Sequence, residues 1–364
     1  MYSFEPNEEQ QMLIDVARRY AENDLRPGAH EAEEERGFPQ KLIEKGWELG
    51  VLQASVPEEY GGFGERSVLT SILALEELAW GDMAGAVAIL VPSLFVSPIL
   101  VAGSEEQKKE WIPPVIEAEW QPYTAAFIEY DYDFDPSDMR TTAELKGGSY
   151  VINGVKRFVP FADKAEAMLV YASLDGKTQA FIVPKGAEGV TIGEREKLLG
   201  LNALPNYPVT FEDVKLPKEN RLGGDEGHDF GTILAANYVT LAAIAVGMSR
   251  ASLEYARDYA KEREVLGSMI AQKQSIAFFM AEMATEIEAI RLLTWEAAWL
   301  LDQGSEEAAH VAFLAWQGAI DMAMMVTDRG VQILGGHGYI REHPVELWLR
   351  NGRGIAALAG LAMV

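Results

Sequence analysis

Apolar residues recur at three- and four-residue intervals in the first part of the chain, which is the spacing of one face of an α-helix. The first such stretch covers residues 7–26, where the repeating positions are Leu13, Val16, Ala17, Tyr20 and Ala21. Asn7 and Gln10 have the spacing of a capping box and predict that a helix begins there. Similar stretches at 39–49, at 66–80 and after Ser104 predict that residues 1–121 form a helical domain.

Between residues 122 and 224 the pattern changes to short runs rich in β-branched and aromatic residues, separated by glycine and proline. The clearest runs are SYVING at 149–154, AMLVYA at 167–172, QAFIVP at 179–184 and YPVTFEDV at 207–214. Runs of this length between turn residues are typical of strands. We therefore expect a small antiparallel β domain in the middle of the chain.

From residue 225 to the end, helical periodicity returns in longer segments. They cover residues 230–260, 272–302 and 306–334. Gly304 interrupts the pattern after the second segment, and Gly335-Gly336 ends the third. Long helices with broad apolar faces pack as antiparallel bundles. The sequence thus predicts an α+β fold with a helical domain at 1–121, a β domain at 122–224 and a helical bundle at 225–364.

The chain is strongly acidic, since 31 Lys and Arg oppose 56 Asp and Glu and give a net charge of −25. Such a surface repels phosphate backbones, so we expect no nucleic acid among its partners. The chain has no cysteine, which excludes disulfides and thiolate ligands. The acidic run 131–138 resembles the start of a calcium loop, but Pro136 and Thr142 stand where that loop needs Gly and Glu. We therefore expect no metal site.

Two uncharged stretches, residues 84–103 and 230–249, have the length of a membrane span. Prolines and serines interrupt the first, Asn237 interrupts the second, and no cluster of Lys or Arg flanks either one. We interpret both as buried core and expect no membrane span. The first ten residues carry three acids and no basic residue, so no signal peptide is recognisable and we expect a cytoplasmic location.

Several motifs along the chain give it a resemblance to a known family. They are FPQKLIEKGWELG and VPEEYGG in the first helical part, GSEEQKKEWIPPV before the sheet, SYVINGVKRFV and VTFEDVKLPKEN within it, and AEMATEIEAIRLLTWEAAW and QILGGHGYIREHPVELWLRN in the bundle. In this order they make the chain resemble the acyl-CoA dehydrogenase family over nearly its whole length. The resemblance implies an N-terminal helical domain, a β-barrel-like domain and a four-helix bundle, in dimers or tetramers with FAD at the subunit interface.

The reaction that the resemblance implies removes a proton from the α carbon of an acyl-CoA thioester and passes hydride from the β carbon to FAD. It needs a carboxylate base, and donors that polarise the thioester carbonyl. In the family the base is a Glu at the position of Ala359 or, in a minority of members, at that of Asn237. Neither side chain is a base, so the resemblance leaves the catalytic base of this chain unknown. Glu129 is the acid that we would test first as a base of the chain's own.

Two groups of positions contact FAD in such an assembly. We call the group that holds the subunit's own flavin the cis half-site, and here it is altered. The resemblance implies flavin contacts from Ile128 and Phe158, but Tyr130 follows Glu129 where the family has a Thr-Glu-Pro loop, and Pro160 replaces a hydroxyl donor. Proline offers neither a side-chain donor nor an amide hydrogen.

The second group, the trans half-site, reaches the flavin of a neighbouring subunit and is kept. Arg263 and Gln274 match the family's Arg-x-x-Phe-Gly segment and its downstream Gln, and Gln332, Gly335 and Gly336 match its glycine-rich segment. Arginine suits a pyrophosphate through bidentate hydrogen bonds, and glycine allows the backbone to approach a ligand closely.

The contrast between the half-sites leads to the hypothesis of a hetero-oligomer. This chain would contribute trans FAD contacts to a related acyl-CoA dehydrogenase subunit, which would supply the base and bind an acyl-CoA-type substrate. Electron-transfer flavoprotein is the electron acceptor that the resemblance implies. The alternatives are a self-sufficient homomeric flavoenzyme with a relocated base or with other chemistry on an acyl thioester, and a flavin-free scaffold subunit.

Overall fold

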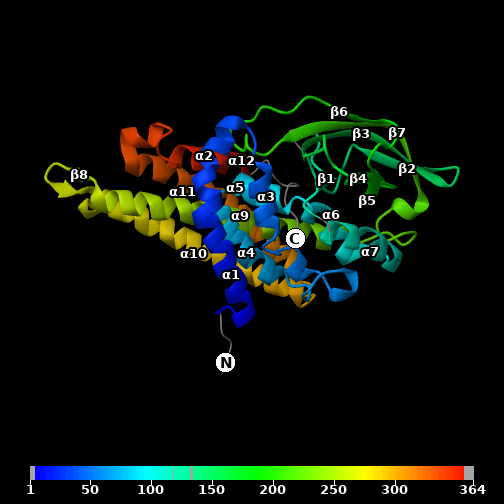
Figure 1. Cartoon of the computed structure of the whole chain (residues 1–364), viewed down its shortest axis with the longest axis horizontal. Helices are drawn as coiled ribbons and strands as arrows, with labels where there is room; N and C mark the ends of the chain where they lie inside the picture. Colours follow the sequence, from blue (N-terminus) through cyan, green and yellow to red (C-terminus); the bar gives the residue numbers. More distant parts are fainter. Residues whose placement is uncertain (1–4, 118, 132–133, 356–364) are drawn as a thin grey trace.

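The computed structural model describes residues 5–117, 119–131 and 134–355. Helices form the N-terminal and C-terminal parts of the chain, and a curled sheet lies between them in sequence, which confirms the predicted fold class (Figure 1). The sheet lies at one end of the molecule, and the long helices of the C-terminal part extend away from it toward the other end (Figure 1).

The first helix begins where the sequence predicts. The Asn7 side chain accepts a hydrogen bond from the Gln10 amide at 2.8 Å, and the Gln10 side chain accepts one from the Asn7 amide at 3.0 Å. The helix continues beyond residue 26, because α1 (Glu8–Tyr20) passes through a π-helical turn (Ala21–Leu25) into α2 (Arg26–Glu35). The proline at the second position of α2 has no amide hydrogen to donate to the preceding turn, which favours such a change in hydrogen bonding.

The remaining helices of the N-terminal part are α3 (Gln40–Trp47), α4 (Val68–Gly81), α5 (Met83–Leu90), α6 (Ser93–Ala102), α7 (Glu105–Trp111) and α8 (Pro113–Ile116). The uncharged stretch 84–103 forms α5 and α6, which meet at an angle of 55°. Most residues of both helices are buried, in agreement with its interpretation as core.

Within the described residues, two helices are long and apolar enough to cross a bilayer by length and composition, namely α9 (Phe230–Glu262) and the helical segment Ala308–Tyr339. The bent pair α5 and α6 would be a third if it counted as one span. In the most apolar window of α9, 72% of the residues are buried inside the protein, against 39% in that of the second segment. This burial supports a core role for α9, while the expectation of no membrane span stays a prediction.

The sheet contains β1 (Tyr123–Ala126), β2 (Thr142–Lys146), β3 (Ser149–Pro160), β4 (Ala167–Leu174), β5 (Lys177–Pro184), β6 (Val190–Ile192) and β7 (Asn206–Pro217). Their order is β1-β4-β2-β3-β7-β6, with β5 paired to β4. All four predicted runs are strands. The prediction of an antiparallel sheet is wrong in part, because β1 and β2 pair with β4 in parallel. Parallel neighbours need a long connection, and other strands intervene in sequence between each of them and β4.

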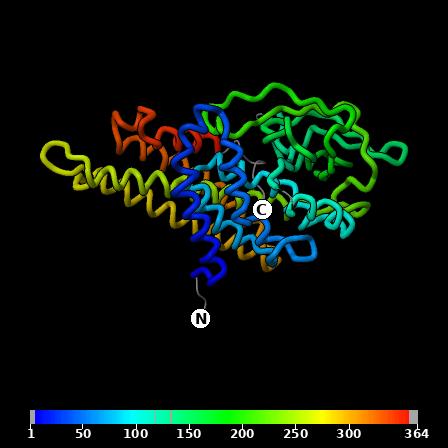
Figure 2. Tube along the Cα trace, viewed as in Figure 1, coloured from blue at the N-terminus to red at the C-terminus, as the bar shows by residue number. Residues whose placement is uncertain are grey.

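The C-terminal part is built on α9, α10 (Gln274–Asp302), α11 (Ala308–Leu334) and α12 (Val345–Gly354). A hairpin of β8 (Glu264–Val265) and β9 (Ser268–Met269) joins α9 to α10. It lies at the end of the bundle opposite the sheet (Figures 1 and 2). Gly335, at φ 59°, ends α11 as predicted, and the turn η6 (Gly335–Tyr339) leads on to α12.

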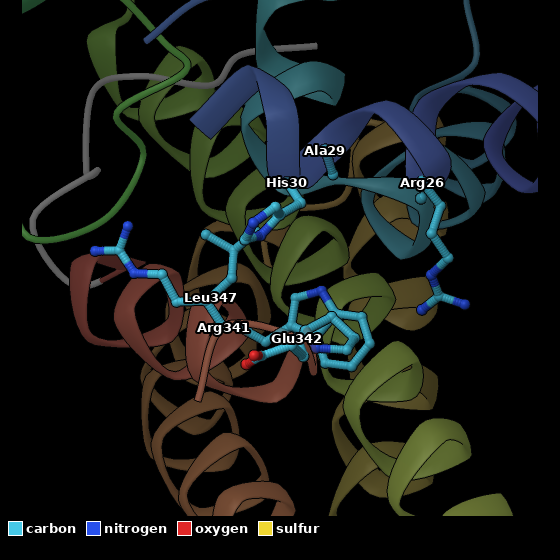
Figure 3. A pocket seen from close by; sticks show the side chains of 9 residues that line it. Arg26, Ala29, His30, Arg341, Glu342 and Leu347 are labelled. Carbon is cyan, nitrogen blue, oxygen red and sulfur yellow. The ribbon is translucent and has the colours of Figure 1, made fainter. Parts of the chain in front are cut away.

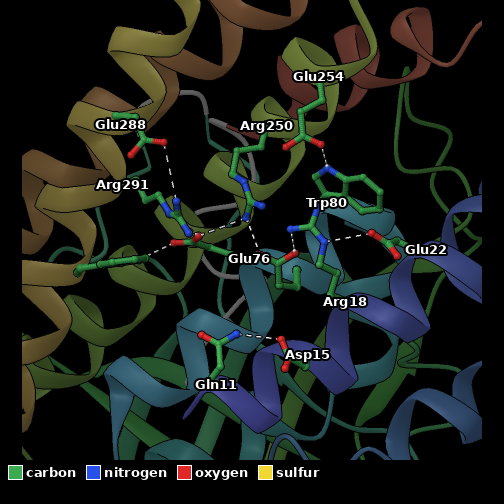
Figure 4. A network of polar contacts seen from close by, with 12 residues as sticks. Gln11, Asp15, Arg18, Glu22, Glu76, Trp80, Arg250, Glu254, Glu288 and Arg291 are labelled. Carbon is green, nitrogen blue, oxygen red and sulfur yellow. Dashed lines mark hydrogen bonds and ion pairs between the residues drawn. The ribbon is translucent and has the colours of Figure 1, made fainter. Parts of the chain in front are cut away.

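A buried carboxylate joins the two helical parts. Glu76 of α4 is 1% exposed and accepts hydrogen bonds from Arg291 Nε at 2.9 Å and Trp295 Nε1 at 2.7 Å, both on α10 (Figure 4). Arg250 of α9 lies 3.7 Å from the same carboxylate and 2.8 Å from that of Glu77. Burial raises the pKa of Glu76, and the two arginines and the indole oppose this shift. Because a buried charge must be paired, these contacts fix α4 against α9 and α10.

Removing this carboxylate should destabilise the protein strongly. Glu76→Leu would leave the Arg291 guanidinium and the Trp295 N–H without their buried acceptor, and breaking a buried pair costs about 3–5 kcal/mol. The matched control is Glu288→Leu, because Glu288 lies 3.8 Å from the same arginine but on the exposed surface, where ion pairs contribute little. Denaturant unfolding of both variants checks the prediction, and equal losses of stability would contradict it.

Candidate functional site

Glu129, in the segment after β1, and Lys156, in strand β3, form a buried ion pair. Glu129 Oε1 accepts hydrogen bonds from Lys156 Nζ and from the Thr141 amide, both at 2.8 Å. Its Oε2 accepts one from the Arg140 amide at 2.7 Å. Lys156 Nζ also donates to the Phe127 carbonyl at 3.0 Å. Each contact to the carboxylate comes from a donor and therefore favours its ionised form.

These contacts set the pKa values of the pair. Burial by itself would raise the pKa of Glu129, but the Lys156 ammonium and the hydrogen bonds to the carboxylate outweigh it and hold that pKa below its usual value. Burial lowers the pKa of Lys156 to about 8, against the opposing effect of Glu129. A carboxylate with a depressed pKa and both oxygens engaged is a poor base. The geometry therefore favours a structural role for Glu129 over a catalytic one.

The cis half-site lies beside this ion pair. The Arg157 amide donates to the Ile128 carbonyl at 2.8 Å, which brings Ile128 next to Phe158. A bulge in β3 places Phe158 at φ 51° and re-aims its side chain. The guanidinium carbon of Arg157 lies 4.3 Å from the ring centre of Tyr130 and 4.7 Å from that of Phe158. These three side chains form a cation–π stack at the positions assigned to the flavin.

Glu196 holds Arg157 in this stack. Its carboxylate accepts hydrogen bonds from Arg157 Nε at 3.1 Å and Nη2 at 2.7 Å. The Phe158 amide donates to the same carboxylate at 3.4 Å. Ile128 is buried and has no polar side-chain atom, and Pro160 ends β3. The donors at this part of the cis half-site are thus already bonded within the chain.

No acidic side chain occupies either base position that the resemblance indicates. Asn237 is buried on α9, and the ring of the neighbouring Tyr238 stacks on Trp316 with centres 6.3 Å apart. Burial raises the pKa of Tyr238, and the charge of Asp135 adds to the shift. Ala359, the other base position, lies outside the described residues.

The residues of the trans half-site gather at the hairpin end of the bundle. Arg263 follows α9 directly, Gln274 begins α10 and Gln332 lies in the last turn of α11. These side chains are exposed, as are Gly335 and Gly336 of η6. A Cβ atom added at either glycine would meet nothing within 4 Å, so the backbone there is open to a ligand.

The tip of the β8–β9 hairpin carries an exposed apolar side chain. Leu266, which stands where the family has Phe, is 93% exposed. It has φ 54° and is followed by Gly267 at φ 74°, which is the geometry of a two-residue hairpin turn. A leucine is strained in this conformation. Exposure and strain at one tip are typical of a functional surface.

Two tyrosine–histidine pairs fasten the glycine turn to α9. Tyr259 Oη lies 2.8 Å from His337 Nδ1, and Tyr255 Oη lies 2.7 Å from His343 Nδ1. The two imidazole rings stack with centres 5.3 Å apart. The Arg263 amide donates to the Tyr259 carbonyl at 2.9 Å, so one turn of α9 supports both the arginine and the glycines. In the sequence, nothing marks these two tyrosines as neighbours of the histidines; only their spacing of one helical turn shows that they share a helix face.

The two half-sites lie at opposite ends of the chain. α9 has 33 residues, and at 1.5 Å per residue it is roughly 50 Å long. Phe230 at its start packs on Phe127 beside the sheet, with ring centres 6.0 Å apart, whereas Arg263 follows its other end. Figures 1 and 2 show the sheet and the hairpin on opposite sides of the molecule. One chain therefore cannot bring both half-sites to the same flavin.

The three-part fold is that of a family of flavoproteins. Three family models match successive parts of the chain: the acyl-CoA dehydrogenase N-terminal domain at residues 7–119, its middle domain at 125–214 and its C-terminal domain at 230–362. The chain belongs to the acyl-CoA dehydrogenase family, whose members depend on FAD.

Relatives of known sequence or structure cover almost the whole chain. The mitochondrial short-chain specific acyl-CoA dehydrogenase of Rattus norvegicus is 36% identical over 360 residues, which are 96% of this chain and 86% of the relative. Butyryl-CoA dehydrogenase of Megasphaera elsdenii superposes with a TM-score of 0.90 at 32% identity, over 99% of this chain and 96% of the other. A chain in the structure of the electron-transferring flavoprotein of Acidaminococcus fermentans has the same TM-score and coverage at 36% identity.

The described residues fit FAD unequally. The trans half-site offers an exposed arginine, two exposed glutamines and an open glycine backbone, which suit a pyrophosphate and a ribose. In the cis half-site, Ile128 and Phe158 have no polar side-chain atom, and the guanidinium of Arg157 lies between two rings. FAD fits the trans half-site and does not fit this arrangement of the cis half-site. Among the described residues, no group of three His, Cys, Asp or Glu side chains is placed to hold a metal ion.

Replacing Glu129 tests its structural role. Glu129→Gln would leave Lys156 buried without its counter-charge, and the free energy of unfolding should fall by about 3–5 kcal/mol near neutral pH. Because the folded pKa of Glu129 is depressed, its contribution should be complete above the unfolded pKa of about 4.3 and should be lost as the pH falls through the folded value. Urea unfolding of the wild type and the variant at several pH values measures both effects.

The control for this variant is Glu144→Gln in the same sheet. Glu144 and Lys146 form an exposed ion pair at 2.6 Å, and exposed pairs contribute little to stability. If Glu129→Gln were as stable as this control and lost acyl-CoA turnover instead, Glu129 would be a base and the structural assignment would be wrong.

Proposed function

We propose that this chain is the non-catalytic subunit of a hetero-oligomeric, FAD-dependent acyl-CoA dehydrogenase. The hairpin end of its bundle packs against a related subunit, and its trans half-site completes the FAD site of that subunit. The partner supplies the catalytic base and oxidises the Cα–Cβ bond of an acyl-CoA thioester.

One contrast supports this proposal: the trans half-site keeps the family's polar and glycine positions, with Leu266 in place of Phe, whereas the polar groups at the cis half-site are bonded within the chain. Arg263, Gln274 and Gln332 are exposed together at the end of the bundle, and an arginine there suits an anionic cofactor. In the cis half-site, Arg157 stacks on Tyr130 and is held by the Glu196 carboxylate. Because α9 keeps the two half-sites apart, each of them would serve a different flavin.

The residues at the base positions also support the proposal that the partner, and not this chain, is the catalytic subunit. Ala359 and Asn237 cannot take a proton from a substrate, and the nearby carboxylate of Glu129 is bound to Lys156. General-base catalysis contributes about 10²–10⁴-fold to a rate. A partner with Glu at the position of Ala359 would supply this contribution.

The chain's own residues would bind and orient the cofactor. FAD, when bound, supplies the hydride acceptor of the family's reaction. Arg263 would pair with a phosphate through bidentate hydrogen bonds, and Gln332 would hold a ribose or adenine edge. The open backbone at Gly335 would approach the cofactor closely. The contact between Tyr259 and His337 would hold this turn at a fixed position relative to Arg263.

The proposed electron acceptor is an electron-transfer flavoprotein. The chain in the Acidaminococcus fermentans electron-transferring flavoprotein structure, 36% identical and superposing over 99% of this chain, supports this assignment.

The trans role is tested in a complex with a related subunit that has Glu at the position of Ala359. Arg263→Met should leave the complex assembled but weaken its FAD binding, because a charge-assisted hydrogen bond worth about 1.5–3 kcal/mol is lost. This corresponds to a roughly tenfold to hundredfold rise in the FAD dissociation constant. Gel filtration measures assembly, and FAD titration of the apo complex measures affinity.

The matched control is Arg257→Met, since Arg257 is an exposed arginine of α9 that pairs with Asp258 at 2.9 Å. It should leave FAD affinity unchanged. An Arg263→Met complex that binds FAD as tightly as the control would contradict the proposed trans role.

Restoring the base alone should not make the chain an enzyme. Ala359→Glu should give no acyl-CoA dehydrogenase activity in the chain purified alone, because the cis half-site lacks donors for a flavin as well. Ala359→Gln is the control for the change in side-chain size. Turnover by Ala359→Glu but not by Ala359→Gln would mean that the cis half-site is competent, and would favour a self-sufficient flavoenzyme.

A further inference from the structure

Arg26 is a largely buried cation that forms no ion pair with any residue that the structure describes. Its guanidinium carbon lies 3.5 Å from the ring centre of Trp80 and 5.1 Å from that of Trp348. Its Nε and Nη2 atoms are buried and make no hydrogen bond to any residue that the structure describes. Burial lowers the pKa of Arg26 to about 10, and the charges of Glu254, Asp82 and Glu22 oppose this shift only in part. The indole rings are thus the main support of this charge.

Other arginines between the helices of this protein are paired with carboxylates. The pairs are Arg250 with Glu77 at 2.8 Å, Arg291 with Glu76 at 2.9 Å and Arg350 with Glu33 at 2.6 Å. A chain with 56 Asp and Glu has ample acids from which a partner could come. Buried N–H groups without an acceptor lower the stability of the folded state. The fold itself does not explain why Arg26, unlike these arginines, has no carboxylate partner among the described residues.

Arg26 borders a cleft of about 550 Å³ between α2, the end of α4 and the segment that leads into α12. Figure 3 shows Arg26 and His30 on α2 facing the segment that carries Arg341, Glu342 and Leu347. His30 and Arg341 add nitrogen donors to the wall, and Arg341 also pairs with Glu34. Clefts of this volume are typical of small-molecule sites.

We propose that this cleft binds a small organic anion, whose carboxylate or phosphoryl group pairs with Arg26 and whose apolar part lies on Trp348 and Leu347. A guanidinium presents a planar fork of donors that matches the oxygens of either group. Nε and Nη2 are covered in this structure, so binding includes a rearrangement of the side chains around Arg26 that opens these atoms to the cleft. The cleft contains no residue of either half-site and is independent of the proposed function.

Such a ligand would connect the two helical parts of the chain. Arg26 is on α2, and Trp348 is on α12, which precedes the segment that contains Ala359. A bound anion would add an ion pair at this junction, where Arg350 of α12 already pairs with Glu33 of α2. Ligand binding should therefore stabilise the docking of α12.

Two probes distinguish the two possible anionic groups. Inorganic phosphate represents a phosphoryl group, and benzoate represents a carboxylate with a flat apolar body. Binding of each is followed by tryptophan fluorescence, since two indoles flank Arg26, and by the unfolding temperature of the full chain. We expect saturable binding of at least one probe, with a rise in unfolding temperature.

Arg26→Met separates a ligand-binding role from a structural one. It should weaken binding by roughly tenfold or more, because a charge-assisted contact is lost. It should also raise the unfolding temperature of the ligand-free chain, because it removes an unpaired buried charge. Arg19→Met, which removes an exposed arginine of α1, is the control and should change neither quantity. Arg26→Lys, which keeps the charge without the planar fork, should bind the anion more weakly than the wild type.

Binding of benzoate alone would identify a carboxylate ligand, and binding of phosphate alone a phosphoryl ligand. The proposal is overturned if neither probe binds saturably, or if Arg26→Met and Arg26→Lys bind as the wild type does. It is also overturned if Arg26→Met lowers the unfolding temperature of the ligand-free chain, because Arg26 would then be a structural residue held by its tryptophans.

Discussion

The length and burial of α9 are the constraint on which the rest of the structure depends. This helix runs from Phe230 to Glu262, and most of its residues from Ile233 to Ser252 are buried against α4, α10 and α11. Its first turn packs beside the sheet and its last turn supports Arg263. A rigid element of this length separates the two places where the chain could touch a flavin. In the assembly that we propose, a complete flavin site consequently needs a second chain.

The charged side chains of this molecule are of two kinds. Some are paired inside the fold and hold its elements together, and others are available to a ligand. Glu76 ties α4 to α10, and Glu129 with Lys156 ties the segment after β1 to β3. Each of these charges has partners of opposite sign, as low-dielectric surroundings require. Arg263 is exposed at the hairpin end, and Arg26 is largely covered but forms no ion pair with a carboxylate among the described residues. The same physical criterion, the presence or lack of an internal partner, thus separates supporting charges from those that we assign to ligands.

The sequence predicts features that depend on local spacing. The capping box at Asn7, the long helices and four strands follow from periodicity and turn residues, and the resemblance adds the family, FAD and the trans residues. The parallel pairing of β1 with β4 has no local signal. The ion pair that makes Glu129 a poor base has no local signal either, because its partner, Lys156, lies 27 residues further on. The pairs Tyr259–His337 and Tyr255–His343 join residues 78 and 88 positions apart, a relation that only the folded chain creates.

We propose above that the chain contributes to a flavin site without completing one of its own. Native mass spectrometry of the chain purified alone, with its flavin absorbance, counts FAD per protomer directly. We expect flavin-free protein or clearly fewer flavins than protomers, because the cis half-site offers a stacked arginine and apolar side chains where FAD would lie. One FAD per protomer in a homodimer or homotetramer would contradict it.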